Sequence, residues 1–143
     1  MPKPSPRRDG REAAVQYLFG HESLGEAESD KDIFELFWNL RDAKPKVQAF
    51  AEELILGVRE HQEEIDASIS GSLENFRMER LTPVDRNILR LGVYEMRFAD
   101  YIPPQAAINE AIEIAKRFGT EDSPKFVNGV LDRILKDSDK NDA

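Results

Sequence analysis

The sequence predicts an all-α fold of about seven helices and no sheet, because apolar residues recur at helical spacing along nearly the whole chain. Prolines and glycines fall between these periodic segments, where they start and end helices. No segment alternates apolar and polar residues between turn signals, as a half-buried strand does. A chain of 143 residues is long enough to bury one sizeable core, so we expect a single domain over residues 9–136.

The two ends of the chain are expected to lie outside this domain. Residues 1–8 are rich in proline and cations, which predicts a flexible basic leader with helical order beginning near Asp9. The last helix is expected to fray from Lys136 onward, leaving residues 137–143 as a polar C-terminal tail.

The first two helices follow the leader. Asp9 and Glu12 form a loose capping-box pattern for a helix that ends before Gly25. Ser29 or Asp30 can cap the second helix, whose wide apolar stripe consists of Ile33, Phe34, Leu36, Phe37 and Leu40 around Trp38. The aromatic side chains Phe34, Phe37 and Trp38 are either core or a self-association surface.

Helical spacing continues over residues 45–73, with a break expected near His61. Thr82–Pro83 then starts a helix that runs to about Arg97, because the hydroxyl caps and the missing proline N–H is not needed there. Asp85 adds a favourable charge in the first turn of that helix.

The last two helices repeat these start signals. Pro103–Pro104 opens a helix that ends at the C-cap candidate Gly119, and Ser123–Pro124 starts the next. The final helix carries a core face of Val127, Val130, Leu131 and Ile134.

Composition and charge exclude several classes of function. The net charge of −8 argues against a general nucleic-acid coat, because phosphate binding needs positive charge gathered on one surface. The absence of cysteine excludes disulfides and thiolate metal sites. No apolar run is long enough for a membrane span, and the start lacks the apolar segment of a signal peptide, so we expect a cytoplasmic protein.

Catalytic and cofactor motifs are not found in the sequence. The glycines stand singly and form no phosphate-binding loop, and no serine occupies a Gly-x-Ser-x-Gly turn. His21 and His61 lie on different segments and lack carboxylates at a metal-binding spacing. We therefore expect no enzymatic activity, no metal and no cofactor.

Arg7, Arg8 and Arg11 form the one dense basic cluster of the sequence. Cations at a helix N-terminus oppose the helix dipole, so their position suggests an external anion as partner. A solvated chain terminus is the alternative interpretation, and the residues alone leave both open.

The second candidate is the segment 119–126. Phe126 lies about 90° from the centre of the last helix's apolar face, which places it at the edge of the core. An aromatic ring there can stack on a nucleobase, but partial burial against the first helix is the more frequent role of a phenylalanine in a first helical turn.

Three segments of the chain resemble the NusB family of antitermination proteins. They read RRDGREAAVQYLF at residues 7–19, LTPVDRNILRLGVYE at 81–95, and AINEA at 107–111 with FGTEDSPKFVNGVLD at 118–132. The resemblance implies two small helical bundles without a cofactor. It also implies that the protein pairs with NusE, a protein of the small ribosomal subunit. The pair would bind the boxA element of nascent ribosomal RNA and suppress premature termination by the transcription elongation complex.

The resemblance assigns roles to individual residues. It matches RNA-binding residues with Arg7, Arg8, Arg11, Asp122, Lys125 and Phe126, and the NusE-facing surface with Phe19 and Asp85. Asp9 and Gly10 depart from the family, which often has a basic residue and an alanine there, and they lower the positive charge and weaken the helix start. Some proteins of this family form homodimers.

Two other functions are compatible with a helical chain of this kind. One is a pure protein-interaction adaptor in which the arginines serve only solubility, as the net charge of −8 allows. The other is the NusB-like RNA-recruiting domain of an RNA-cytosine methyltransferase. The sequence holds no methyl-donor-binding region and no catalytic cysteine, which argues against that enzyme.

Overall fold

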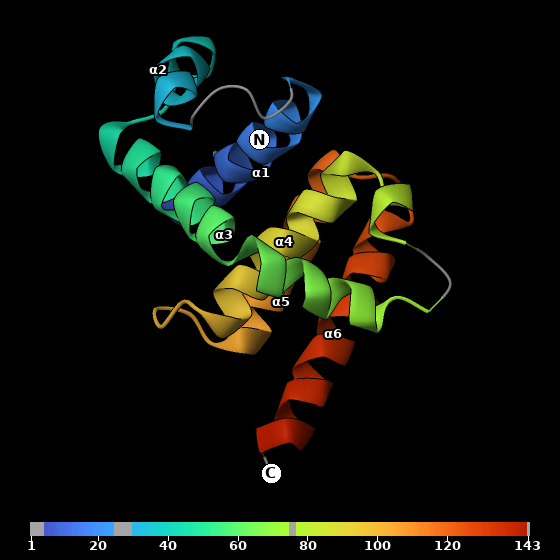
Figure 1. The fold of residues 1–143 in the computed structure, drawn as a ribbon. Helices are drawn as coiled ribbons and strands as arrows, with labels where there is room; N and C mark the ends of the chain where they lie inside the picture. The colour runs from blue at the N-terminus through green and yellow to red at the C-terminus, as the bar shows by residue number, and fades with distance from the viewer. Residues whose placement is uncertain (1–4, 25–29, 75–76, 143) are drawn as a thin grey trace. The chain divides into compact units, whose positions relative to one another are not determined.

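The computed structural model describes residues 5–24, 30–74 and 77–142, the side chains of 23, 24 and 139–142 excepted. These residues form six α-helices and one 3-10 turn: α1 (Pro6–Leu24), α2 (Asp30–Leu40), α3 (Pro45–Ser72), η1 (Met78–Arg80), α4 (Pro83–Arg97), α5 (Pro104–Phe118) and α6 (Ser123–Asp142) (Figure 1). No strand occurs among them, so the all-α prediction is confirmed. None of the described helices is long and apolar enough to cross a membrane.

The chain divides into two compact units, Met1–Gly57 and Val58–Ala143. The first unit holds α1, α2 and the first part of α3, and the second holds the rest of α3 with α4, α5 and α6. The two small helical bundles that the family resemblance implies correspond to these units.

The helix break expected near His61 is wrong, because α3 continues through it as one helix of 28 residues. The residues around His61 are polar, yet none of them is a proline, and Pro45 stands in the first turn where its missing N–H is not needed. Ile65 and Ile69 are fully buried and continue the core face beyond His61.

Two helix starts differ from the sequence expectation. Helix α1 begins at Pro6 and not near Asp9, because the hydroxyl of Ser5 accepts a hydrogen bond from the Arg8 backbone N–H at 3.2 Å. Residues 6–8 of the expected leader are therefore helical, whereas residues 1–4 lie outside the described part. Helix α6 begins at Ser123, one residue before the proline. It extends to Asp142 and so includes most of the segment 137–143 that was expected to form a polar tail.

The start of α4 agrees with its prediction. The Thr82 hydroxyl accepts a hydrogen bond from the Asp85 backbone N–H at 3.1 Å, and Pro83 is the first helical residue. A capping hydroxyl of this kind contributes about 1 kcal/mol to helix stability. It also fixes the first turn of α4, which carries Asp85.

Aromatic side chains fill much of the core of the first unit. The ring of Tyr17 lies 5.1 Å from that of Phe34 and 5.4 Å from that of Phe37, and its hydroxyl donates to Asp30 at 2.7 Å. Trp38 is half-buried and donates its indole N–H to Glu52 at 2.8 Å. The aromatic cluster of α2 thus packs within its own unit. Two aliphatic members of the predicted stripe instead stay exposed, namely Leu36 and Leu40.

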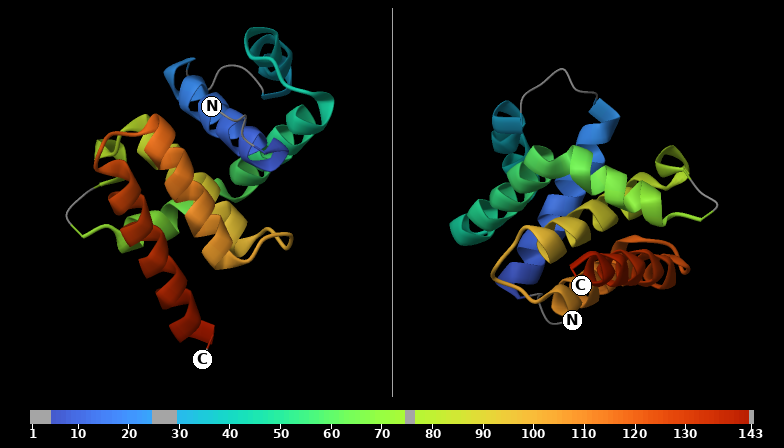
Figure 2. Two further views of the ribbon diagram at one scale, coloured as in Figure 1. Left: turned by 180° about the vertical axis from the view of Figure 1, so that it is seen from behind. Right: turned by 60° about the horizontal axis from the view of Figure 1, so that its bottom comes forward.

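In the second unit, α4, α5 and α6 pack against one another, and Figure 2 shows α5 running beside α6. A Cβ on Gly92 would lie 2.8 Å from Leu131, so the glycine permits close approach of α4 and α6. The buried guanidinium of Arg90 donates to both carboxylate oxygens of Asp66, at 2.8 and 3.0 Å, and ties α4 to α3. Bidentate pairing compensates the cost of burying this charge.

Candidate nucleic-acid interface

The arginine patch, defined as Arg7, Arg8 and Arg11, lies in the first two turns of α1. The guanidinium carbon of Arg7 stands 4.2 Å from the ring centroid of Phe50, and that of Arg11 stands 5.7 Å from it. Both distances lie in the range of a cation–π interaction. Phe50 belongs to α3 and is 8% exposed, so the ring holds these cations from within the first unit.

Exposure differs among the three arginines. Arg7 is exposed and Arg8 is half-buried, whereas Arg11 is only 5% exposed. All three take part in interactions within the protein. An external phosphate therefore meets Arg7 and Arg8 more readily than Arg11.

The two departures from the family pattern, Asp9 and Gly10, have local structural partners. The Asp9 carboxylate accepts a hydrogen bond from the Arg41 guanidinium at 2.7 Å, so its negative charge is offset inside the first unit. A Cβ on Gly10 would lie 2.7 Å from Cδ2 of Phe50, closer than real Cβ contacts. Gly10 thus lets the Phe50 ring approach α1 beneath the arginine patch.

The residues predicted on the C-terminal side meet in one pocket, here called the α6 pocket. It has a volume of about 530 Å³ and is lined by Asp122, Lys125, Phe126, Gly129, Val130 and Arg133 of α6 and its start, together with Ser72, Leu73 and Glu74. Phe126 is half-buried, which confirms its predicted place at the edge of the core. Stacking of its ring on a base remains a prediction.

A tight turn presents this end of α6. The buried Ser123 hydroxyl accepts a hydrogen bond from the Thr120 backbone N–H at 2.9 Å. It therefore fixes the turn between α5 and α6, whereas the sequence had predicted that Ser123 caps α6. A Cβ on Gly119 would lie 2.5 Å from Ser123, which leaves room only for glycine. The turn leads directly into Asp122, which lines the pocket together with Phe126.

The pocket also contains charged residues that the sequence reasoning missed. Arg133 and Glu74 both line the pocket, and Arg133 donates a hydrogen bond to Glu74 at 2.6 Å. Both side chains remain largely exposed. Arg133 follows Phe126 by seven residues, so helical spacing alone could have placed it on the same face. Nothing in the sequence joins Glu74 to this face.

The residues matched to a protein partner lie in different units. Phe19 of α1 is 40% exposed, and Asp85 is half-buried in the first turn of α4. One carboxylate oxygen of Asp85 is buried and has no hydrogen-bond partner among the described residues. Their partner-facing roles remain predictions.

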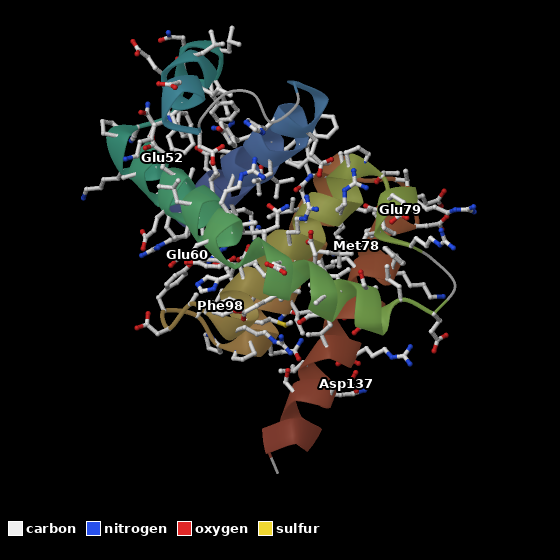
Figure 3. The ribbon with its side chains drawn as sticks, viewed as in Figure 1. Glu52, Glu60, Met78, Glu79, Phe98 and Asp137 are labelled. Carbon is white, nitrogen blue, oxygen red and sulfur yellow. The ribbon has the colours of Figure 1, made fainter. Side chains whose placement is uncertain are left out.

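The two histidines pack against aromatic rings. The His61 ring stacks on Phe98, labelled in Figure 3, with the centroids 3.8 Å apart, and His21 stacks on Tyr17 at 5.7 Å. Within the described ranges, no group of three or more histidine, aspartate or glutamate side chains is arranged to hold a metal ion.

Comparison with known proteins shows similarity over nearly the whole chain. A sequence model of the NusB family matches residues 8–136. The transcription antitermination protein NusB of Geobacter sulfurreducens is 46% identical over 132 residues, which cover 90% of this chain and 92% of that protein. NusB of Bacillus velezensis is 47% identical over 131 residues, covering 92% and 96%.

Solved structures agree with these sequence matches. T. maritima NusB superposes with a TM-score of 0.78 at 44% identity, covering 95% of this chain and 93% of that one. A chain from a crystal structure of the antitermination factors NusB and NusE in complex with double-stranded RNA gives a TM-score of 0.80 at 30% identity. That match covers 92% of this chain and 96% of the other.

Proposed function

The chain belongs to the NusB family, and from this membership we propose that it is an RNA-binding transcription antitermination factor. Together with NusE it binds the boxA element of nascent ribosomal RNA and suppresses premature termination by the elongation complex. The protein acts by binding alone, without catalysis, and works in the cytoplasm where the transcript is made.

The observation that carries this proposal is the α6 pocket. Asp122, Lys125 and Phe126 were matched to RNA-binding residues by sequence, and all three line this pocket. A half-buried aromatic ring beside an exposed lysine suits single-stranded RNA, because the ring stacks on a base and the ammonium meets the backbone.

The arginine patch supplies phosphate contacts. Arg7 and Arg8 are accessible, and the Phe50 ring orients Arg7 at 4.2 Å, which reduces the entropy lost when the guanidinium binds a phosphate. Arg11 contributes positive potential from a buried position. Such contacts give affinity and orientation but no sequence preference.

NusE compensates for the acidity of this chain. A net charge of −8 opposes the approach of RNA, so a basic partner bound next to the RNA strengthens the complex. We assign the exposed ring of Phe19 and the half-buried side chain of Asp85 to the NusE contact. A solved structure of the relatives NusB and NusE with double-stranded RNA supports this partnership.

Replacing Phe126 by leucine tests the proposal, because leucine keeps most of the apolar volume and removes the aromatic face. In the presence of NusE, we expect Phe126→Leu to lose about 1 to 3 kcal/mol of boxA binding, measured by fluorescence anisotropy with labelled RNA. The melting temperature should change little, since Phe126 is only half-buried. A large stability loss with normal RNA affinity would show that the ring serves the core.

The same titration separates the proposed function from the adaptor alternative. A wild-type protein that binds NusE but no RNA, alone or in the mixture, would be an interaction adaptor. Binding of boxA RNA that depends on Phe126 supports the antitermination role.

A further inference from the structure

Gly129 stands in the interior of α6 with no structural reason of its own. Glycine destabilises a helix interior relative to alanine, so it usually marks a close packing contact. Gly92 is such a case, because a Cβ there would meet Leu131 at 2.8 Å. A Cβ on Gly129 would meet nothing within 4 Å, and the residue is exposed.

The position of Gly129 suggests what the missing side chain leaves room for. Gly129 lines the α6 pocket between Phe126 and Arg133 and exposes bare helix backbone there. Val130 and Leu73 add apolar surface to the same wall. A flat ring can therefore lie on the backbone at Gly129 with its edge or face against Phe126.

Charge at the two ends of this surface indicates the kind of ligand. Lys125 lies at one end and Arg133 at the other, about 10 Å along the helix from Phe126 by helical rise. Arg133 is bound to Glu74 at 2.6 Å, with the two side chains 47% and 71% exposed. Exposed ion pairs of this kind are weak, so a phosphate can replace the carboxylate.

We propose that the α6 pocket holds an unpaired nucleobase of the RNA over Gly129, and that Arg133 leaves Glu74 to bind a neighbouring phosphate. Glu74 then acts as an internal competitor that lowers RNA affinity. An acidic peptide would use the cations but not the flat surface beside Phe126. This inference rests on the proposed RNA binding and extends it to three residues, Gly129, Arg133 and Glu74.

The first test places a methyl group on the surface where the base would lie. Gly129→Ala should raise the melting temperature, because alanine favours the helix and its Cβ meets no neighbour. The same change should weaken boxA binding in the presence of NusE by about fivefold or more, since the base can no longer contact the backbone. Gly71→Ala is the matched control, an exposed helix glycine outside the pocket lining whose Cβ also meets nothing. It should stabilise the protein and leave RNA affinity unchanged.

The second test removes the competitor. Glu74→Gln should tighten RNA binding by about threefold. An exposed ion pair is weak, so breaking the Arg133–Glu74 pair costs RNA binding only a few-fold in affinity. Arg133→Gln should weaken binding about threefold at low salt and make the salt dependence shallower. The double variant should behave like Arg133→Gln, because Glu74 acts only through Arg133.

The ion pair between Lys136 and Asp132 provides a matched control for charge. Its atoms lie 2.9 Å apart on α6, and neither residue lines the pocket. Asp132→Asn frees a cation and removes one negative charge, as Glu74→Gln does, and should leave RNA affinity nearly unchanged. Equal tightening by Asp132→Asn and Glu74→Gln, or normal RNA binding by Gly129→Ala, would overturn the inference. In either case, RNA binding that still depends on Phe126 would leave the proposed function standing.

Discussion

The ring of Phe50 links two features of α1, the bare backbone at Gly10 and the guanidinium of Arg7. Because Arg7 and Arg11 cover the ring, it has little freedom to move away from a new side chain. Gly10→Ala should therefore lower the free energy of unfolding by about 1 to 3 kcal/mol through overpacking, despite the better helix propensity of alanine. Chemical denaturation measures this loss. Gly71→Ala, in open space, should instead gain up to about 1 kcal/mol, and a gain at both positions would contradict the contact.

Arg7 and Arg8 are the accessible members of the arginine patch. Arg7→Glu combined with Arg8→Glu should weaken boxA binding at least tenfold, or about 1.4 kcal/mol, because two phosphate contacts become repulsive. The helical circular dichroism signal should not change. The same charge change at Lys31 and Lys44, both exposed in the first unit, should have a much smaller effect. If the two double variants bind RNA equally well, the arginines are only a solvated terminus.

At the scale of elements, the turn between α5 and α6 depends on the Ser123 hydroxyl. Ser123→Ala leaves the Thr120 N–H without its partner, so we expect a stability loss of about 1 to 3 kcal/mol. RNA affinity should also fall about threefold, because binding must then order the turn that holds Asp122. Thr82→Ala removes the cap of α4 and should cost about 1 kcal/mol of stability. The RNA affinity of Thr82→Ala, measured without NusE, should not change. If Thr82→Ala and Ser123→Ala lose equal RNA affinity, Ser123 has no special role in RNA binding.

Net charge governs the behaviour of the whole molecule toward RNA. Contacts from Arg7, Arg8, Lys125 and Arg133 imply a log–log salt slope of only about −3 for the protein alone. NusE should raise affinity about tenfold or more and steepen this slope by adding cationic contacts. A salt series of boxA binding with and without NusE measures both quantities, and no change in either would refute the partnership.

Asp85→Lys should reduce the gain that NusE provides, if Asp85 faces that partner. The substitution also places a cation in the first turn of α4, where it opposes the helix dipole and costs up to about 1 kcal/mol of stability. The melting temperature of the variant must therefore be measured beside its NusE titration. A normal NusE gain in a folded variant would remove Asp85 from the interface.

The sequence by itself determined the helical class, most helix starts and the family. The helix start at Thr82–Pro83 can be predicted from sequence because a cap and its first turn lie within four residues. The apolar spacing that predicts each helix is equally local. Local patterns gave a wrong prediction at His61, where a helix break was expected but a polar stretch without proline remains helical. They also placed Ser5 in a flexible leader, whereas its hydroxyl caps α1. The resemblance to the NusB family predicts Asp122, Lys125 and Phe126 as RNA-binding residues, and the structure shows that all three line one pocket.

Only the tertiary structure decided which residues from separate helices meet. Phe50 is a core residue that also holds the guanidinium of Arg7, and the Asp9 carboxylate is paired with Arg41 from the segment between α2 and α3. Glu74 reaches Arg133 although 59 residues separate them along the chain. Helical periodicity tells which face of one helix is apolar, but it contains no information about which other face lies opposite. Those pairings follow from the packing of helices, and they set the charge and the shape of both proposed RNA-binding patches.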